Sequence, residues 1–100
     1  MPEYRLSRAA RLDLIEIADY TVDTWGLAQA RRYLDGMVGC FRQLARTPGI
    51  GRTCDRIRRG YRRMEYEKHV VIYRVEGDSI FISRILHQRM LPSRHLIEDD

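Results

Sequence analysis

The first half of the sequence contains two stretches in which apolar residues recur with the 3.6-residue period of an α-helix. Ser7 stands where a helix N-cap is expected, Gly26 separates the two stretches, and Pro48 follows the second. So short a connection between two long helices predicts an antiparallel helical hairpin. Tyr20 falls off the apolar stripe and is expected to be a contact residue. The inward-facing positions are expected to be Ala10, Leu14, Ile17, Ala18, Thr21 and Trp25, then Ala30, Tyr33, Leu34, Met37, Val38, Phe41, Leu44 and Ala45. The outer face of the first helix is expected to carry Asp13, Glu16, Asp19 and Asp23.

The second half of the sequence changes to the pattern of β-strands. Residues 61–66, 69–75 and 79–87 are rich in β-branched and aromatic residues, and Gly77-Asp78 is a two-residue hairpin turn. Residues 4–6 are expected to form an edge strand, and residues 50–59 a polar connection. The element order predicts an α+β fold of the type β-α-α-β-β-β. Its N-terminal helical hairpin packs on a small antiparallel sheet, in a single domain of residues 1–100.

The hydrophobic core is expected between the helices and the sheet. Residues 70–73 and 80–82 are apolar on both faces, so both faces of the sheet need a cover. The helical hairpin covers one face, and only residues 93–97 remain to cover the other, which favours a partner protein that completes the fold. The predicted core consists of Leu14, Ile17, Ala18, Leu34, Met37, Val38, Phe41, Leu44, Val71 and Ile72.

Positive charge is concentrated in one segment. The chain has a net charge of +4, and residues 42–63 hold eight arginines against a single acid, Asp55. Guanidinium groups bind carboxylates and phosphates bidentately, so this segment favours an acidic partner or an anionic surface. A solvated basic face is the alternative interpretation of the same charges.

Several other classes of protein are not indicated. The sequence has no apolar run long enough to span a bilayer and no secretory signal, so a cytoplasmic location is expected. Cys40 and Cys54 lack the spacing of metal or redox sites and are expected to be free thiols, with a disulfide as the alternative. No metal and no cofactor are expected, and no DNA-recognition motif is present.

RNA cleavage is the enzymatic reaction that the residues could support. Arg62, Arg84 and Arg89 could hold a phosphate, with His87 or Glu65 as acid or base. Strand alternation, however, places Arg84 and His87 on opposite faces of the last strand unless a bulge intervenes. A single histidine at a strand end is also commonly structural, so no catalytic residue is assigned.

The order and spacing of several short motifs resemble the ParE branch of the RelE/ParE toxin superfamily. The similarity runs from Tyr4-Arg5-Leu6-Ser7 to Arg94-His95-Leu96, and Leu91 departs from the acid often found at that position. Its motifs are Ala10-x-x-Asp13-Leu14-x-x-Ile17-x-x-Tyr20-Thr21, Trp25-Gly26-x-x-Gln29-Ala30-x-x-Tyr33, Pro48-x-x-Gly51-Arg52, Ile57-Arg58-x-Gly60-Tyr61-Arg62, His69-Val70-Val71-Ile72-Tyr73-Arg74 and Arg84-Ile85-Leu86-His87-x-x-Met90. This resemblance implies the same fold and a toxin of a type II toxin–antitoxin pair.

The resemblance also implies partners. ParE-like toxins inhibit DNA gyrase by protein–protein contact, whereas the alternative, a RelE-type toxin, is a ribosome-dependent mRNA endoribonuclease. The expected antitoxin is a ParD-like ribbon-helix-helix protein whose acidic tail folds on the toxin, so that DNA is contacted only indirectly, through the antitoxin. The residues expected to bind the antitoxin are Tyr20, Arg58, Arg59, Tyr61, Arg62 and Tyr73. Those expected to contact the target and cause toxicity, without catalysis, are Arg84, His87, Arg89 and Met90.

Overall fold

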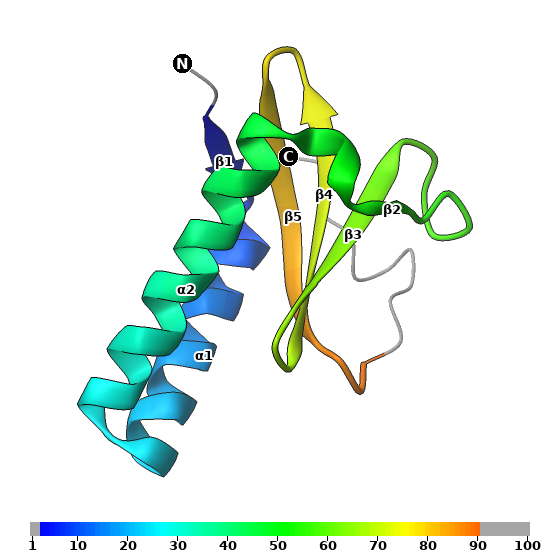
Figure 1. Ribbon diagram of the computed structural model, residues 1–100. Helices are drawn as coiled ribbons and strands as arrows, with labels where there is room; N and C mark the ends of the chain where they lie inside the picture. Colours follow the sequence, from blue (N-terminus) through cyan, green and yellow to red (C-terminus); the bar gives the residue numbers. More distant parts are fainter. Residues whose placement is uncertain (1–2, 91–100) are drawn as a thin grey trace.

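Ser7 and Gly26 set the limits of the first helix, as the sequence predicts. The computed structural model describes residues 3–90 (Figure 1). The Ser7 hydroxyl oxygen accepts a hydrogen bond of 2.9 Å from the backbone N–H of Ala10, so α1 (Arg8–Trp25) begins with a satisfied N-cap. Gly26, with a φ of 90°, ends α1, and α2 (Leu27–Arg46) begins at the next residue. Figure 1 shows the two helices running side by side along one face of a sheet. The predicted helical hairpin is therefore confirmed. Within residues 3–90, neither helix combines the length and the apolar character that crossing a membrane requires.

The remaining described elements form one five-stranded sheet and a short 3-10 helix, η1 (Pro48–Ile50). The strands are β1 (Tyr4–Leu6), β2 (Arg52–Thr53), β3 (Tyr61–Tyr66), β4 (His69–Glu76) and β5 (Ser79–His87), in the spatial order β1-β5-β4-β3-β2. Neighbours from β5 to β2 are antiparallel, whereas β1 lies parallel to β5. The predicted α+β fold is confirmed. The structure adds β2, within the segment expected to be a polar connection, and one parallel strand pair.

The core between the helices and the sheet contains most of the residues predicted for it. Ile17, Met37, Phe41, Leu44 and Val71 are buried there. Leu14, Leu34 and Val38 pack against this cluster with partial exposure. Ala18, on α1, is half-buried. The prediction for Trp25 is wrong, because its side chain is 64% exposed at the hairpin tip. Trp25 is the last residue of α1, where the sheet no longer lies beneath the helix (Figure 1).

A second apolar cluster lies on the other face of the sheet. It contains Tyr61, Val70, Ile72 and Leu86 from the strands, with Cys54 and Ile57 from the segment between β2 and β3. Ile72 therefore belongs to this cluster and not to the one beneath the helices. The expectation that only residues 93–97 could cover this face is wrong, since the segment after β2 contributes to the cover. Residues 93–97 themselves lie outside the described part of the chain.

Candidate functional site

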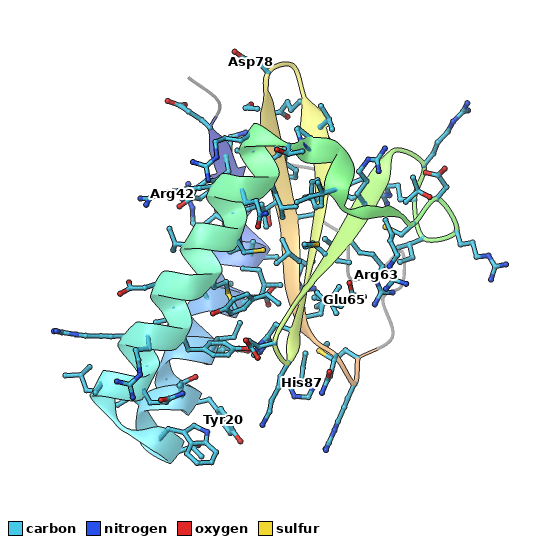
Figure 2. All side chains as sticks on the ribbon, viewed as in Figure 1. Tyr20, Arg42, Arg63, Glu65, Asp78 and His87 are labelled. Atoms are coloured by element: carbon cyan, nitrogen blue, oxygen red, sulfur yellow. The ribbon has the colours of Figure 1, made fainter. Side chains whose placement is uncertain are left out.

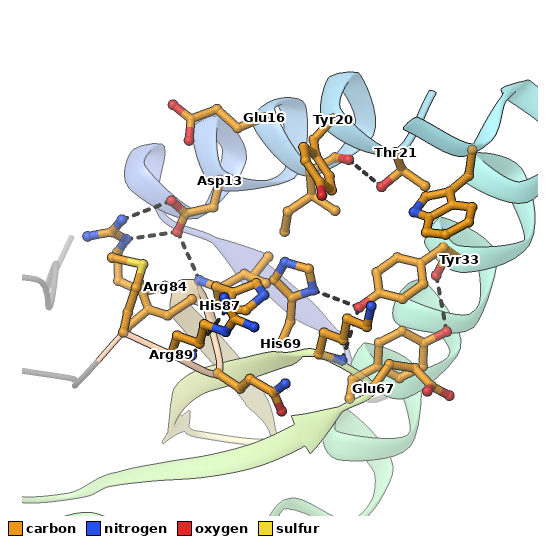
Figure 3. Close-up of a pocket in the computed structure, with 18 of the residues that line it drawn as sticks. Asp13, Glu16, Tyr20, Thr21, Tyr33, Glu67, His69, Arg84, His87 and Arg89 are labelled. Atoms are coloured by element: carbon orange, nitrogen blue, oxygen red, sulfur yellow. Dashed lines mark hydrogen bonds and ion pairs between the residues drawn. The ribbon is translucent and has the colours of Figure 1, made fainter. Parts of the chain in front are cut away.

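A groove lies between the tip of the helical hairpin and one end of the sheet. Its volume is about 1020 Å³, and its lining comes from α1, α2, the β3–β4 turn and the end of β5 (Figure 3). Three large side chains at this groove are well exposed, with values of 67% for Tyr20, 64% for Trp25 and 42% for Met90. Exposed aromatic and methionine side chains of this kind are typical of surfaces that bind another protein.

The groove brings together all four residues predicted to contact a target. Arg84, His87, Arg89 and Met90 all line it, and so does Tyr20, which was predicted to contact the antitoxin. Strand alternation does place Arg84 and His87 on opposite faces of β5, because no register shift falls between them, yet both side chains line the groove. Arg84 lies beyond the last pairing of β1 with β5, so its long side chain is free to bend around the strand edge toward α1.

Asp13 holds Arg84 in this position. The Arg84 guanidinium donates to both carboxylate oxygens of Asp13, from Nε at 2.8 Å and from Nη2 at 2.9 Å. The backbone N–H of Ile85 donates to the same carboxylate at 2.9 Å. Asp13 thus satisfies a backbone donor on the edge of β5 that β1 is too short to pair. The prediction that Asp13 lies on the outer face of the helix is wrong, since Asp13 is only 9% exposed.

A second set of contacts joins α2 to the ends of β4 and β5. The hydroxyl of Tyr33 lies 2.6 Å from Nδ1 of His69, and the rings of His69 and His87 meet edge to face with centroids 5.5 Å apart. The Tyr66 hydroxyl donates to the backbone carbonyl of Tyr33 at 3.1 Å. Figure 3 shows His69, His87 and Tyr33 together at the floor of the groove.

The turn after β5 is built on His87. The backbone N–H of Arg89 donates to His87 Nδ1 at 3.1 Å, and that of Met90 donates to the His87 carbonyl oxygen at 2.9 Å. The backbone N–H of Gln88 donates to the Lys68 carbonyl oxygen at 2.8 Å, which ties the turn to the β3–β4 connection. These bonds present the exposed side chains of Arg89 and Met90 at the mouth of the groove.

The environment of His69 predicts a pH dependence of stability. Burial, and after it the neighbouring His87, lower the pKa of His69 below its usual 6.5, with Asp13 opposing the shift. The unfolded chain therefore takes up a proton at a pH where the folded chain still keeps His69 neutral. We expect the free energy of unfolding to decrease as the pH falls below 6.5, until the lower folded-state pKa is passed. In a His69→Gln variant this decrease should be smaller in urea unfolding measured between about pH 7.5 and pH 5. An equal pH dependence in both proteins would contradict the assignment.

The remaining predicted contact residues do not reach the groove. Tyr61 and Tyr73 are 2% and 0% exposed, and the Tyr73 hydroxyl donates to the Pro48 carbonyl oxygen while accepting from the Gly51 N–H. Neither side chain offers a surface to an antitoxin, so their predicted role does not fit the structure. The signal that favoured them, an aromatic residue on a strand, equally describes a core position.

The arginines of the predicted antitoxin site lie away from the hairpin tip. Arg58 and Arg59 occupy the loop between β2 and β3, and Arg62 lies on β3, where its Nη1 donates to the Gly51 carbonyl oxygen at 2.7 Å. Figure 1 shows this loop on the opposite side of the molecule from the α1–α2 connection. Tyr20 is thus separated from the arginine group that was expected to share its partner.

The acid–base candidates of the RNA-cleavage hypothesis are also separated. Glu65 makes ion pairs with Arg52 and Arg63 on the β2–β3 side of the sheet and does not line the groove of His87. Figure 2 shows Glu65 beside Arg63, away from His87. Sequence reasoning missed His69 as the residue that meets His87, because it took His69 only as part of a strand.

Among residues 3–90, neither the cysteines nor the other potential metal ligands form a candidate site. Cys40 and Cys54 are free thiols, as the sequence predicts. Both are buried, in the clusters on opposite faces of the sheet. Burial raises the pKa of each thiol above its usual value, which favours the unreactive protonated form. No group of three or more potential metal ligands occurs in this part of the chain.

Comparison with known proteins gives one consistent family. Residues 4–92 match the family described as the ParE toxin of the type II toxin–antitoxin system parDE. A Toxin ParE1 of Mycobacterium tuberculosis is 46% identical over 94 residues, covering 93% of this chain and 96% of the relative. A Toxin ParE1 of Caulobacter vibrioides is 42% identical over 96 residues, covering 96% of this chain and 99% of the relative.

Two solved structures share the fold. A chain of the chromosomal ParDE toxin–antitoxin system from P. aeruginosa superposes with a TM-score of 0.74 at 26% identity, over 87% of this chain and 96% of that one. A chain of the RelBE2 toxin–antitoxin complex from Mycobacterium tuberculosis superposes with a TM-score of 0.65 at 23% identity, over 87% and 99% of the two chains. The second likeness concerns the fold alone. From the family match and these full-length relatives, the chain belongs to the ParE toxin family of type II toxin–antitoxin systems.

Proposed function

We propose that this ParE-family toxin inhibits DNA gyrase by protein–protein contact and that a cognate antitoxin neutralises it. The observation that carries the proposal is the groove at the hairpin tip. Four side chains predicted to contact the target, Arg84, His87, Arg89 and Met90, converge there. Arg89 and Met90 offer a charge-assisted donor and an adaptable apolar group on one short turn, a combination suited to a protein surface.

The proposed antitoxin is a ParD-like ribbon-helix-helix protein whose tail folds on the toxin in the cytoplasm. Tyr20 and Trp25 supply exposed aromatic surface for an apolar side of that tail. The arginines of the β2–β3 loop supply cations for its acids, because Arg59 is exposed and Asp55 is the only acid in the segment from residue 42 to 63. A single tail that contacts both the tip of the helical hairpin and the β2–β3 loop has to cross the molecule. In this arrangement the toxin contacts DNA only indirectly, through the antitoxin.

The second candidate function is ribosome-dependent mRNA cleavage. One observation favours it, namely that His69 and His87 meet in a groove also lined by Lys68 and Arg89. A pair of histidines beside cations is a possible acid–base and phosphate-binding set. Against it, Nδ1 of each histidine is already engaged, by Tyr33 and by the Arg89 backbone. Glu65, the carboxylate candidate, lies elsewhere.

Induction of the toxin in bacterial cells separates the two functions. We expect the DNA-damage response and loss of chromosome integrity to precede any loss of mRNA, measured by a damage-reporter promoter, chromosome gels and primer extension on abundant messengers. Purified toxin should inhibit supercoiling by purified gyrase, and equimolar antitoxin should restore it. Early mRNA cleavage with intact chromosomes and unaffected gyrase would favour the endoribonuclease instead.

A further inference from the structure

The side chain of His87 closes the turn that presents Arg89 and Met90. Its Nδ1 accepts the backbone N–H of the residue two positions later, the arrangement that asparagine and aspartate make in an Asx turn. A backbone N–H can only donate, so this nitrogen carries no hydrogen and the single ring proton of His87 is on Nε2. The turn in this structure therefore requires a neutral His87.

The ring of His87 is held in place by a chain of contacts that begins on α2. The Tyr33 hydroxyl oxygen accepts the Lys68 backbone N–H at 3.4 Å, and we assign its own hydrogen to the 2.6 Å bond with His69 Nδ1. Tyr33 thereby fixes the orientation of the His69 ring. The His69 ring in turn meets that of His87 at 80°.

These contacts give His87 a role distinct from binding. Its ring is partly buried against His69, whereas Arg89 and Met90 are exposed on the turn that it closes. Loss of the Nδ1 acceptor leaves the backbone of the turn intact at Gln88 and Met90 but frees the N–H of Arg89. The direction in which the Arg89 side chain leaves the turn is then no longer fixed.

We propose that His87 is a positioning residue, held by the Tyr33–His69 pair, that orients the Arg89–Met90 turn for the toxin's target. This inference rests on the proposed function, because it assumes that the turn contacts the target. It assigns the target contacts to Arg89 and Met90, and to His87 the geometry of the turn.

The test uses the purified full-length toxin and compares two substitutions of His87. Asparagine places an oxygen where Nδ1 lies, whereas leucine has no acceptor. We expect His87→Leu to inhibit gyrase supercoiling about two- to tenfold more weakly, the effect of one hydrogen bond. His87→Asn should restore most of that loss.

Two further variants separate positioning from stability. Tyr33→Phe keeps the ring but removes the hydroxyl that orients His69, so it should weaken inhibition in the same direction as His87→Leu. Tyr73→Phe removes two hydrogen bonds of a buried tyrosine outside the groove. It should lower the urea midpoint and leave inhibition unchanged.

Three results would overturn the inference. One is a folded His87→Leu toxin that inhibits as wild type does. Another is equal loss in His87→Leu and His87→Asn, which would make the imidazole itself the contact. The third is a loss of inhibition in Tyr73→Phe as large as that in His87→Leu, which would make stability the cause. Failure of the proposed function is recognised separately, since wild-type toxin would then not inhibit gyrase at all.

Discussion

Replacing Asp13 with alanine is expected to lower the free energy of unfolding by about 2–4 kcal/mol, the scale for a largely buried ion pair that loses one partner. The side chains of Arg84 and Asp13 are 18% and 11% exposed, so little solvent is available to replace the carboxylate. The substitution leaves the guanidinium without its bidentate acceptor and the Ile85 N–H without the carboxylate oxygen that it bonds. Urea unfolding monitored by circular dichroism measures the change.

Glu16 provides the matched control for this prediction, since it is an exposed acid on the same helix. Glu16→Ala should change stability by less than about 0.5 kcal/mol, as surface substitutions usually do. Asp13→Asn should fall between the two because it keeps one oxygen acceptor. In a double-mutant cycle, Asp13→Ala combined with Arg84→Ala should cost less than the sum of the single changes. Additive losses would show that the two side chains do not stabilise each other.

The combined substitution Arg89→Ala and Met90→Ala is expected to abolish growth inhibition while leaving folding and antitoxin binding near wild type. Both side chains are exposed on the turn after β5 and belong to neither described apolar cluster, so their loss removes surface without creating a cavity. Colony formation after induction measures toxicity. Thermal unfolding and co-purification with the antitoxin measure the other two properties.

Arg42 is the matched control for this second prediction. It is an exposed arginine on α2, outside the groove (Figure 2). Arg42→Ala should remain as toxic as wild type, which separates the position of the charge from net charge alone. If the double variant of Arg89 and Met90 still arrested growth, the turn after β5 could not be the target contact. If it lost toxicity only together with its fold, the turn would be a structural element.

Local sequence determined the elements of this fold. The helical stripes, the Ser7 N-cap and the Gly26 boundary act over a few residues, so their pattern is visible without knowledge of the fold. Local patterns also predicted the three long strands and the Gly77-Asp78 turn, and the order of the motifs predicted the family. The helical periodicity also predicted most of the core residues, because residues on one face of a helix are buried together.

The placement of Asp13 on the outer face of α1 was wrong because it was based on the charge of the residue. The residue lies three positions after Ala10 and four before Ile17, and therefore on the buried face of α1. An aspartate there was assigned to solvent because its partner, Arg84, lies 71 residues away. The burial of a carboxylate depends on a cation and a free strand edge that only the assembled sheet places beside it.

The register of β5 was likewise decided by tertiary structure. Counted from the Gly77-Asp78 turn, an unbroken hairpin would pair His69 with Leu86. In the structure Tyr73 pairs with Ile82 but the preceding residue, Ile72, pairs with Arg84, so Ser83 is an extra, bulged residue on β5. As a result His69 pairs with His87. The Ser83 carbonyl oxygen accepts from the Ser7 hydroxyl at 2.6 Å, a contact between the two ends of the fold. Hairpin signals act over a few residues and therefore predict the strands. The bulge depends on Ser7, which lies 76 positions from Ser83, so the sequence of neither strand predicts it. Local patterns were therefore enough to predict the helical hairpin, the three long strands and the family. The histidine pair and the groove around it depend on contacts between segments far apart in the chain.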